Sequence, residues 1–239
     1  MEATDRRLFT RHNKSGETQM NCLFCDLAVG PNLRRNPEDQ FLAESPSFYV
    51  KPALGHFATG YVLINSRRHV PSAAFLTEHE LVELELVKGV VAQRLEQIYH
   101  HKVIVFEHGE VNEDHHPGCC FEHAHLHVVP LPEVIDDALD LDFHKVEVAK
   151  LVELTKLADD NTSYLLYEMR NGCRHAFEVP SNLPSQFMRR KVCQKLGMDY
   201  EWDWAVSPFR DRINEFLGSY RSYAISNGWS YEIAGLCKS

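Results

Sequence analysis

The sequence has little that would place the chain in a membrane or on nucleic acid. No hydrophobic run reaches the ~18 residues of a membrane-spanning helix, so we expect no membrane partner. The first twenty residues are polar and lack the apolar segment of a secretory signal. Basic residues are outnumbered, with 25 Lys and Arg against 34 Asp and Glu, a net charge of −9. We therefore expect no duplex nucleic-acid partner, although a local basic pocket for phosphates is compatible with this charge.

Cysteine use argues against a disulfide framework. The seven cysteines are an odd number, and two of them, Cys22 and Cys25, have Cys-x-x-Cys spacing. This pattern fits a reducing compartment and a metal site better than paired disulfides, so we expect a cytoplasmic protein. Hydrophobic residues make up 44% of the 239 residues, which is enough for one core, or for one core with an appended subdomain.

Three histidines at alternating positions are the most informative feature of the chain. They lie in residues 123–129, His-Ala-His-Leu-His-Val-Val, and this alternation is the pattern of a β-strand with one buried face. The three imidazoles then emerge on one side of a sheet, roughly 6–7 Å apart at ~3.3 Å of rise per residue. Such a row can offer a nucleophile, a proton donor and an anion clamp, or it can hold a metal. Strict alternation disfavours a solvated face with chance histidines.

The surrounding pattern predicts an antiparallel sheet with a long helix packed across it. Strands are expected at residues 41–51, 60–65, about 102–107 and 123–129. Thr77 and Glu80 form a capping box at the start of a helix over about 78–100. Apolar residues recur along this helix at three- and four-residue steps and give it one apolar face.

These features resemble the histidine triad (HIT) superfamily of nucleotide hydrolases and transferases. Residues 123–129 match its signature His-Φ-His-Φ-His-Φ-Φ, in which Φ is apolar, and residues 22–25 match a Cys-x-x-Cys pair that many members carry. Residues 60–69, Gly-Tyr-Val-Leu-Ile-Asn-Ser-Arg-Arg-His, resemble the family's strand and turn, although Tyr, Asn and Ser depart from the usual residues. Residues 106–109 and 118–119 resemble the strand and hinge loop before the triad. The resemblance covers about residues 20–132.

The resemblance implies an α+β, HIT-like antiparallel sheet with a long packing helix. It also implies a homodimer, built through the long helix and a central strand into one continuous sheet. With the rest of the chain, we expect a flexible arm at residues 1–20, a histidine triad domain at 21–145, and a C-terminal α/β extension at 146–239 packed on it.

The extension reads as two strands followed by helices. The strands are expected at residues 163–170 and 174–179, and the helices near 184–197 and 209–223. Residues 184–190 and 202–204 resemble the C-terminal extension of the splicing-associated and debranching-associated branch of the superfamily. They are interpreted either as the aromatic core of a small subdomain, which we favour, or as part of a substrate site.

In the family the middle histidine, here His125, is the nucleophile that attacks the α-phosphorus of a nucleotide. The attack needs a neutral imidazole with one lone pair aimed at phosphorus and the other nitrogen held as N–H by an acceptor. The resemblance makes that acceptor a backbone carbonyl of the same strand, that of His123. His127 is placed to donate to an α-phosphate oxygen and to stabilise the charge that develops there.

The loop before the triad supplies the phosphate-binding candidates. Asn112 lies thirteen residues before His125, where some members place an amide on the phosphate or leaving-group oxygen, and a plain turn role is the alternative. Gly118 and Cys119 lie where backbone amides or a small polar side chain usually meet the phosphate. Cys120 takes a position that is Ser in some relatives, and a thiol is a poorer proton donor to a leaving group.

A structural zinc ion is the expected cofactor. Two thiolates, Cys22 and Cys25, and two imidazoles, at the family-equivalent positions His69 and His123, complete a closed tetrahedral set. Such a zinc would hold the N-terminal segment against the triad strand, and it makes His123 a ligand and not a proton shuttle. The alternative is an empty cysteine pair. Rival histidines are interpreted as substrate-loop or solvated residues: His108, His115 and His116.

The expected activity is cleavage of a nucleoside phosphate anhydride, ester or phosphoramidate through a covalent nucleotidyl-histidine intermediate. Diadenosine tetraphosphate (Ap4A) hydrolase-like and adenylyl-hydrolase-like enzymes are the models. Relatives that exchange sugar nucleotides usually have Gln at the third triad position, so His127 favours hydrolysis or phosphorolysis. The first alternative is a catalytically weak nucleotide-binding or scaffold protein. The second, a metal-dependent hydrolase with the triad as ligands, lacks an acidic residue at suitable spacing.

Overall fold

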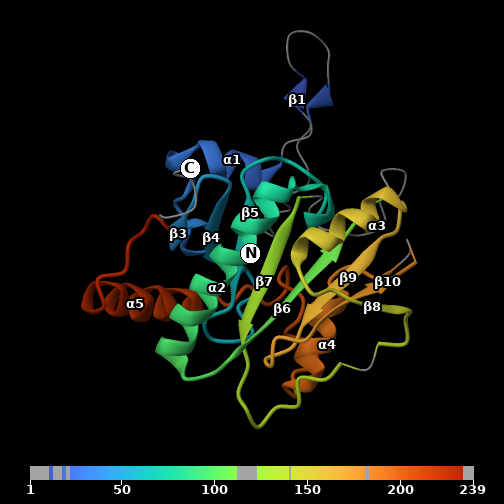
Figure 1. Cartoon of the computed structure of the whole chain (residues 1–239). Helices are drawn as coiled ribbons and strands as arrows, with labels where there is room; N and C mark the ends of the chain where they lie inside the picture. The colour runs from blue at the N-terminus through green and yellow to red at the C-terminus, as the bar shows by residue number, and fades with distance from the viewer. Residues whose placement is uncertain are drawn as a thin grey trace.

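The computed structural model describes residues 11–12, 18–19, 22–111, 123–139, 141–180 and 183–233, and its centre is an antiparallel sheet (Figure 1). The sheet has eight strands in the order β3-β4-β5-β7-β6-β9-β10-β8. They are β3 (Ala43–Glu44), β4 (Phe48–Pro52), β5 (Val62–Ser66), β6 (Val103–Gly109), β7 (His125–Pro130), β8 (Lys145–Glu147), β9 (Tyr164–Glu168) and β10 (Arg174–Glu178). A separate antiparallel pair joins β1 (Arg11–His12) to β2 (Thr18–Gln19). The predicted α+β class with an antiparallel sheet is confirmed.

The helices of the described residues are α1 (Leu23–Val29), α2 (Glu78–Tyr99), α3 (Thr155–Asp159), α4 (Phe187–Lys195) and α5 (Arg210–Ser226). Short 3-10 turns lie at Pro31–Leu33, Pro37–Asp39, Ala73–Phe75 and Leu151–Leu154. Helix α2 is the expected long helix. It begins with the predicted capping box, in which Thr77 and Glu80 each accept the other's backbone N–H, and it ends before His100 in a left-handed conformation. None of the helices among the described residues is long and apolar enough to cross a membrane.

The two faces of the sheet are covered by different helices. On one face, Leu126 of β7 packs in the larger hydrophobic core together with Leu84 of α2, which crosses the sheet in Figure 1. On the other face, Phe106 of β6 packs in a second core with Phe24 of α1 and Met188 of α4. Because successive side chains of a strand point to opposite faces of the sheet, alternate residues of each strand face either α2 or the pair α1 and α4.

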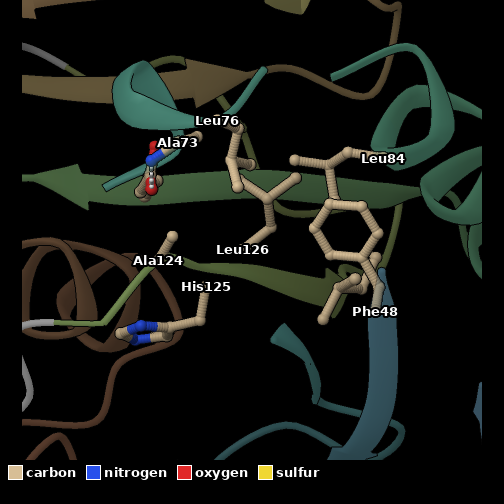
Figure 2. A pocket seen from close by; sticks show the side chains of 9 residues that line it. Phe48, Ala73, Leu76, Leu84, Ala124, His125 and Leu126 are labelled. Atoms are coloured by element: carbon tan, nitrogen blue, oxygen red, sulfur yellow. Dashed lines mark hydrogen bonds between the residues drawn. The ribbon is translucent and has the colours of Figure 1, made fainter. Parts of the chain in front are cut away.

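Strand β7 shows this sorting at the triad. Figure 2 shows Leu126 turned toward Leu76 and Leu84 on the α2 side, while the imidazole of His125 lies on the other side of the strand. The small hollow around these residues is lined mainly by apolar side chains. The imidazoles of His125 and His127 consequently belong to the α1/α4 face.

The C-terminal segment continues the central sheet. Strand β9 pairs with β6 over five residues, from Val105 opposite Glu168 to Gly109 opposite Tyr164. Strands β10 and β8 follow in order, and β8, a strand that the sequence did not predict, spans the expected boundary between residues 145 and 146. Strand β6 thus has β7 on one edge and β9 on the other. In this chain β9 occupies the second edge of β6, so a homodimer through β6 would require the second copy to displace β9.

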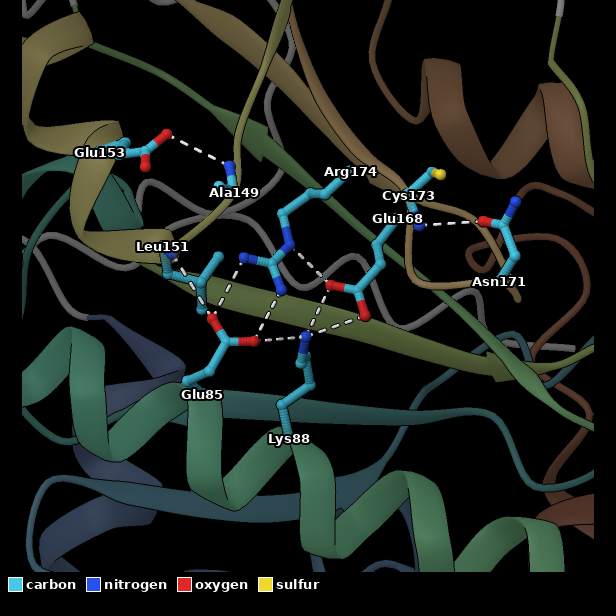
Figure 3. A network of polar contacts seen from close by, with 9 residues as sticks. All are labelled: Glu85, Lys88, Ala149, Leu151, Glu153, Glu168, Asn171, Cys173 and Arg174. Atoms are coloured by element: carbon cyan, nitrogen blue, oxygen red, sulfur yellow. Dashed lines mark hydrogen bonds and ion pairs between the residues drawn. The ribbon is translucent and has the colours of Figure 1, made fainter.

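A buried network of charges holds the extension against α2 (Figure 3). Lys88 of α2 lies 2.6 Å from the carboxylate of Glu168 on β9 and 2.7 Å from that of Glu85. Arg174 of β10 binds the same two carboxylates, at 2.6 Å from Glu85 and 2.7 Å from Glu168. Two cations therefore face two anions, and each charge has two partners. Lys88, Arg174 and Glu168 are largely desolvated, whereas the Glu85 side chain is 38% exposed. This network fixes the position of β9 and β10 relative to the helix.

Candidate functional site

Strand β7 carries the catalytic candidates, and its neighbours β5 and β6 determine what lies beside them. Asn65 of β5 is opposite His125, while Leu63 of β5 and Phe106 of β6 are opposite His127. The rings of His125 and His127 have centroids 4.7 Å apart. The two imidazoles share one face of the sheet, as the alternation predicted.

His125 has a fixed tautomer. Its Nδ1 atom lies 2.6 Å from the backbone carbonyl oxygen of His123, the acceptor that the resemblance implied. A carbonyl oxygen can only accept, so Nδ1 carries the proton and the lone pair is on Nε2. Burial lowers the pKa of His125 to about 4, against the opposing effect of this backbone contact, so the ring is neutral at neutral pH. A neutral imidazole with its lone pair on Nε2 is the form that can attack phosphorus.

His127 is held by aromatic side chains. The ring of Phe106 stacks on it with centroids 4.4 Å apart and planes 10° apart. The hydroxyl of Tyr61 lies 2.5 Å from its Nδ1 atom, and Arg189 of α4 donates to the same hydroxyl at 3.0 Å. Burial, and then the charges of His125 and Arg189, keep the pKa of His127 well below its usual value. His127 is therefore neutral as well.

The four predicted zinc ligands come together at the start of the triad strand. The ligand atoms of Cys22, Cys25, His69 and His123 all lie within 4.8 Å of one another. The Nδ1 atom of His123 is 3.3 Å from the sulfur of Cys22, 3.6 Å from that of Cys25 and 3.3 Å from Nδ1 of His69. Tetrahedral bonds of about 2.3 Å to sulfur and about 2.0–2.1 Å to nitrogen separate S and N by about 3.5 Å and two N by about 3.3 Å. The distances from His123 to the other three ligand atoms therefore match a tetrahedral zinc site.

Two neighbouring contacts support this set of ligands. Nε2 of His123 lies 2.7 Å from the carbonyl oxygen of Ser66, so this nitrogen donates and Nδ1 keeps its lone pair for a metal. Burial, followed by the adjacent thiol of Cys22, raises the pKa of Cys25 to about 12. A divalent cation between the two thiols would reverse that effect, because metal-bound thiols ionise. The contacts also separate His123 from His125 and His127, so the triad does not form a joint set of metal ligands.

Phe24 connects the cysteine and histidine cluster to the catalytic strand. It lies on α1 between Cys22 and Cys25, and its ring centroid is 5.4 Å from those of both His123 and His125. Its carbonyl oxygen accepts a hydrogen bond of 2.8 Å from the hydroxyl of Tyr49 on β4. Fixing the two cysteines therefore also fixes an aromatic wall beside His125.

Several residues that were singled out from the sequence are not found in the site described above. Asn112, Gly118, Cys119 and Cys120 lie outside the described residues, as do His115 and His116. His108 was interpreted as a substrate-loop or solvated residue; it lies on β6 opposite Leu165 of β9 and not in a loop. It is close enough to add to the effect of burial in lowering the pKa of His125 and His127. The strand continues to Gly109 because β9 pairs with it.

Two further polar residues near His125 were not singled out from the sequence. Lys51 of β4 is buried, burial lowers its pKa to about 8, and its ammonium lies 5.7 Å from the Phe24 ring centroid. Asn65 is fully buried, and its amide has no hydrogen-bond partner among the residues described. In the sequence, Asn65 and Tyr61 could have been recognised as site residues because both depart from the residues usual in the family. Nothing in the sequence indicated a role for Arg189 beyond its place in a basic helix, because Tyr61, the residue that it contacts, is distant in sequence.

Comparison with known proteins finds similar structures but no similar sequences. No family model and no curated protein matches the chain. A HIT-like protein involved in cell-cycle regulation from Bartonella henselae shares 15% identity, with a TM-score of 0.38 over 59% of this chain and 96% of its own. A hypothetical histidine triad nucleotide-binding protein from Sulfolobus tokodaii shares 18%, with 0.38 over 59% and 91%. A HIT family hydrolase from Clostridium thermocellum shares 20%, with 0.37 over 51% and 100%.

Each match leaves about two fifths or more of this chain uncovered. The chemistry of the site therefore depends on the residues of this chain alone.

Proposed function

We propose that the protein cleaves a nucleoside phosphate anhydride, ester or phosphoramidate at its α-phosphorus through a covalent intermediate on His125. The observation that carries the proposal is the 2.6 Å contact from Nδ1 of His125 to the carbonyl oxygen of His123. This contact leaves Nε2 as a neutral nucleophile with a fixed direction. A histidine whose Nδ1 had no such acceptor would not support this chemistry.

The reaction has two steps. Nε2 of His125 forms a bond to phosphorus while the bond to the leaving group breaks, and the leaving group takes the electron pair. His127 donates a hydrogen bond to a phosphate oxygen and stabilises the charge that builds up there. Water then attacks the phosphorus and releases neutral His125, and the proton that water loses balances the one that the leaving group takes up. Inorganic phosphate or another nucleophile in place of water gives phosphorolysis or nucleotidyl transfer.

We further propose that zinc is held by Cys22, Cys25, His69 and His123. Their mutual distances and the orientation of His123 support this assignment. With four protein ligands the ion has no open position, so it stabilises the fold and supplies no reactive water. The ligands instead hold α1 and the start of β7 together. Two thiolates at such a site also suit a reducing compartment, which makes the cytoplasm our proposed location.

The proposed activity is tested with three nucleotide substrates and one variant. Adenosine phosphoramidate, diadenosine tetraphosphate and a nucleoside diphosphate sugar are incubated with the protein, and intact-protein mass spectrometry after rapid denaturation detects a nucleotidyl adduct. Turnover of the phosphoramidate or the dinucleotide is expected. His125→Ala should lose the adduct and lower turnover at least about 1000-fold, because no other group replaces the nucleophile.

The matched control is His144→Ala, since the His144 side chain is 70% exposed and is not part of the triad. It should keep both turnover and adduct. Full turnover by His125→Ala would overturn the proposal. Nucleotide-dependent thermal stabilisation without any turnover would instead support the alternative, a nucleotide-binding or scaffold protein with an idle triad.

A further inference from the structure

A chain of three buried polar side chains connects the C-terminal extension to the triad. Arg189 lies on α4 and is 5% exposed, and its Nη1 atom is 3.0 Å from the hydroxyl oxygen of Tyr61, which is fully buried. The same oxygen is 2.5 Å from Nδ1 of His127 on β7. The three residues are distant in sequence, and the fold alone brings them together.

The direction of the hydrogen bonds in this chain follows from the chemistry of the groups. A guanidinium has donors and no acceptor, so the oxygen of Tyr61 accepts from Arg189. Burial raises the pKa of Tyr61 to about 12, so the phenol keeps its own hydrogen. Among the described residues, the acceptor within reach of that hydrogen is Nδ1 of His127. Nδ1 then has no proton, and the proton of the neutral ring is on Nε2.

Arg189 is held in place by backbone carbonyls. Its Nε donates to Trp202 at 2.8 Å and its Nη2 to Gly55 at 2.8 Å. Its guanidinium also lies over the ring of Phe57, 5.1 Å from the centroid. No carboxylate among the described residues lies within 4.0 Å of it, so the charge is not used in an ion pair.

The turn at Gly55 is shaped to receive this guanidinium. Gly55 has a φ of +71°, and a Cβ atom there would lie 2.3 Å from Nη2 of Arg189. Both the left-handed backbone and the close approach require glycine. The cavity that holds Arg189 is therefore built from the extension and the β4–β5 turn together.

We propose that Arg189 is a positioning residue, which acts through Tyr61 to hold His127 in the tautomer that carries its proton on Nε2. His125 is fixed in the opposite tautomer by the carbonyl of His123. Two adjacent imidazoles then present a lone pair and an N–H, which are the two functions that attack on a phosphate and binding of its oxygen require. The effect of this tautomer on catalysis rests on the proposed function, but the assignment of the His127 tautomer itself does not.

This inference gives the extension a role in the site. The segment around Trp202 was interpreted as an aromatic core or a substrate site, and here its backbone carbonyl anchors Arg189. The extension thus contributes to the position of His127 through Arg189 and Tyr61.

The direct test is the tautomer of His127 in the wild-type protein, measured by long-range proton–nitrogen NMR with labelled histidine. The His127 signals are assigned with His127→Asn. We expect a protonated Nε2 and an unprotonated Nδ1. A proton on Nδ1 would overturn the inference, whatever the activity of the protein, and this measurement needs no folded variant of Arg189.

Variants of α4 supply the second test. In Arg189→Met the oxygen of Tyr61 loses its donor and can accept from Nδ1, so the His127 signals should shift toward a mixture of tautomers. On a substrate that the wild type turns over, kcat should fall about 10- to 100-fold with a smaller change in KM. Arg189→Lys, which keeps a donor, should recover part of both effects.

Arg190→Met is the matched control. Arg190 is the next residue of α4 and carries the same charge, but its guanidinium lies over Trp202, 4.2 Å from the ring centroid. Its tautomer spectrum and kcat should match the wild type. An unchanged His127 spectrum in Arg189→Met would reject the positioning role, even if kcat fell. Loss of activity in His125→Ala but not in Arg189→Met would also reject the positioning role of Arg189, and it would leave the proposed function intact.

Discussion

Within the triad, three chemically identical side chains differ through their nearest neighbours. His123 turns Nε2 toward the carbonyl of Ser66 and Nδ1 toward two thiols. His125 turns Nδ1 toward a carbonyl, and His127 turns Nδ1 toward the hydroxyl of Tyr61. Each partner selects one nitrogen as donor and the other as acceptor. One acceptor or hydroxyl beside each ring is therefore enough to separate the proposed ligand, the proposed nucleophile and the proposed donor.

Glu107 predicts a pH dependence of stability. It is buried on β6, and burial raises its pKa to about 7, although Tyr164 and the N–H of Ala73 donate to it. Between pH 4.5 and about 7 the native protein keeps a proton that the unfolded chain releases, so the free energy of unfolding falls as pH rises. The fall is at most about 1.4 kcal/mol per pH unit.

The measurement is urea unfolding of wild type and Glu107→Gln between pH 4.5 and 8. The advantage of the wild type over the variant should shrink as pH rises to about 7 and stay constant above it. A difference that grows with pH would contradict a raised pKa.

The structure leaves no room for a side chain at position 109, where the extension joins the sheet. A Cβ atom at this position would lie 2.1 Å from the ring of Tyr164 on β9. Gly109→Ala should therefore destabilise the protein by roughly 1–3 kcal/mol in urea unfolding, because the ring or the strand must move. Gly89→Ala is the control, since nothing lies within 4 Å of its Cβ, and in the middle of α2 it should stabilise by up to about 1 kcal/mol. Equal effects at both positions would count against the described packing.

At the scale of secondary-structure elements, α1 depends on the cysteine and histidine cluster. The helix has seven residues, fewer than an isolated helix needs in water, so its stability comes from its contacts. Its two cysteines face His69 and His123, and Phe24 between them packs beside His125. Loss of the proposed zinc ion is expected to loosen both α1 and the packing of Phe24 beside His125.

The prediction is one zinc ion per chain in protein purified without chelator, measured by atomic emission. Cys25→Ser should lose most of it and lower the melting temperature, because structural zinc contributes folding energy. Cys173→Ser should keep the zinc, since Cys173 is exposed and lies outside the cluster. A chain that binds no zinc with the four ligands intact would refute the assignment.

At the scale of the whole molecule, one chain completes the sheet. Strand β9 covers the edge of β6, and Lys88 and Arg174 join the extension to α2 through shared carboxylates. Removing one member of such a buried network leaves an uncompensated charge, so the network favours a single arrangement. The extension therefore occupies the edge of β6 that a second copy would need for a sheet continued through β6.

The resulting prediction is a monomer. Size-exclusion chromatography with light scattering should give the mass of one chain, 27.5 kDa, at micromolar concentration. Addition of nucleotide should leave this mass unchanged. A species of twice that mass would show that two copies associate through another surface, because both edges of β6 are already paired.

Local patterns were sufficient for much of the sheet and its central helix. The capping box placed the start of α2, and the alternation of residues 123–129 placed β7 and the shared face of His125 and His127. Strands β9 and β10 and helices α4 and α5 also lie within a few residues of their expected positions. Strand β8 was missed, because its exposed residues have no alternation of burial and it forms only by pairing with β10.

The amino-acid sequence by itself determined the candidates for the proposed chemistry: the alternating histidines, the cysteine pair and the helix that supports their strand. These follow from periodicity, spacing and capping, which act between residues close together in the chain. Tertiary structure decided which nitrogen His123 and His125 present, that β9 closes the edge of β6, and that Arg189 reaches Tyr61. Those outcomes depend on contacts between segments up to 128 residues apart, and no local pattern specifies them.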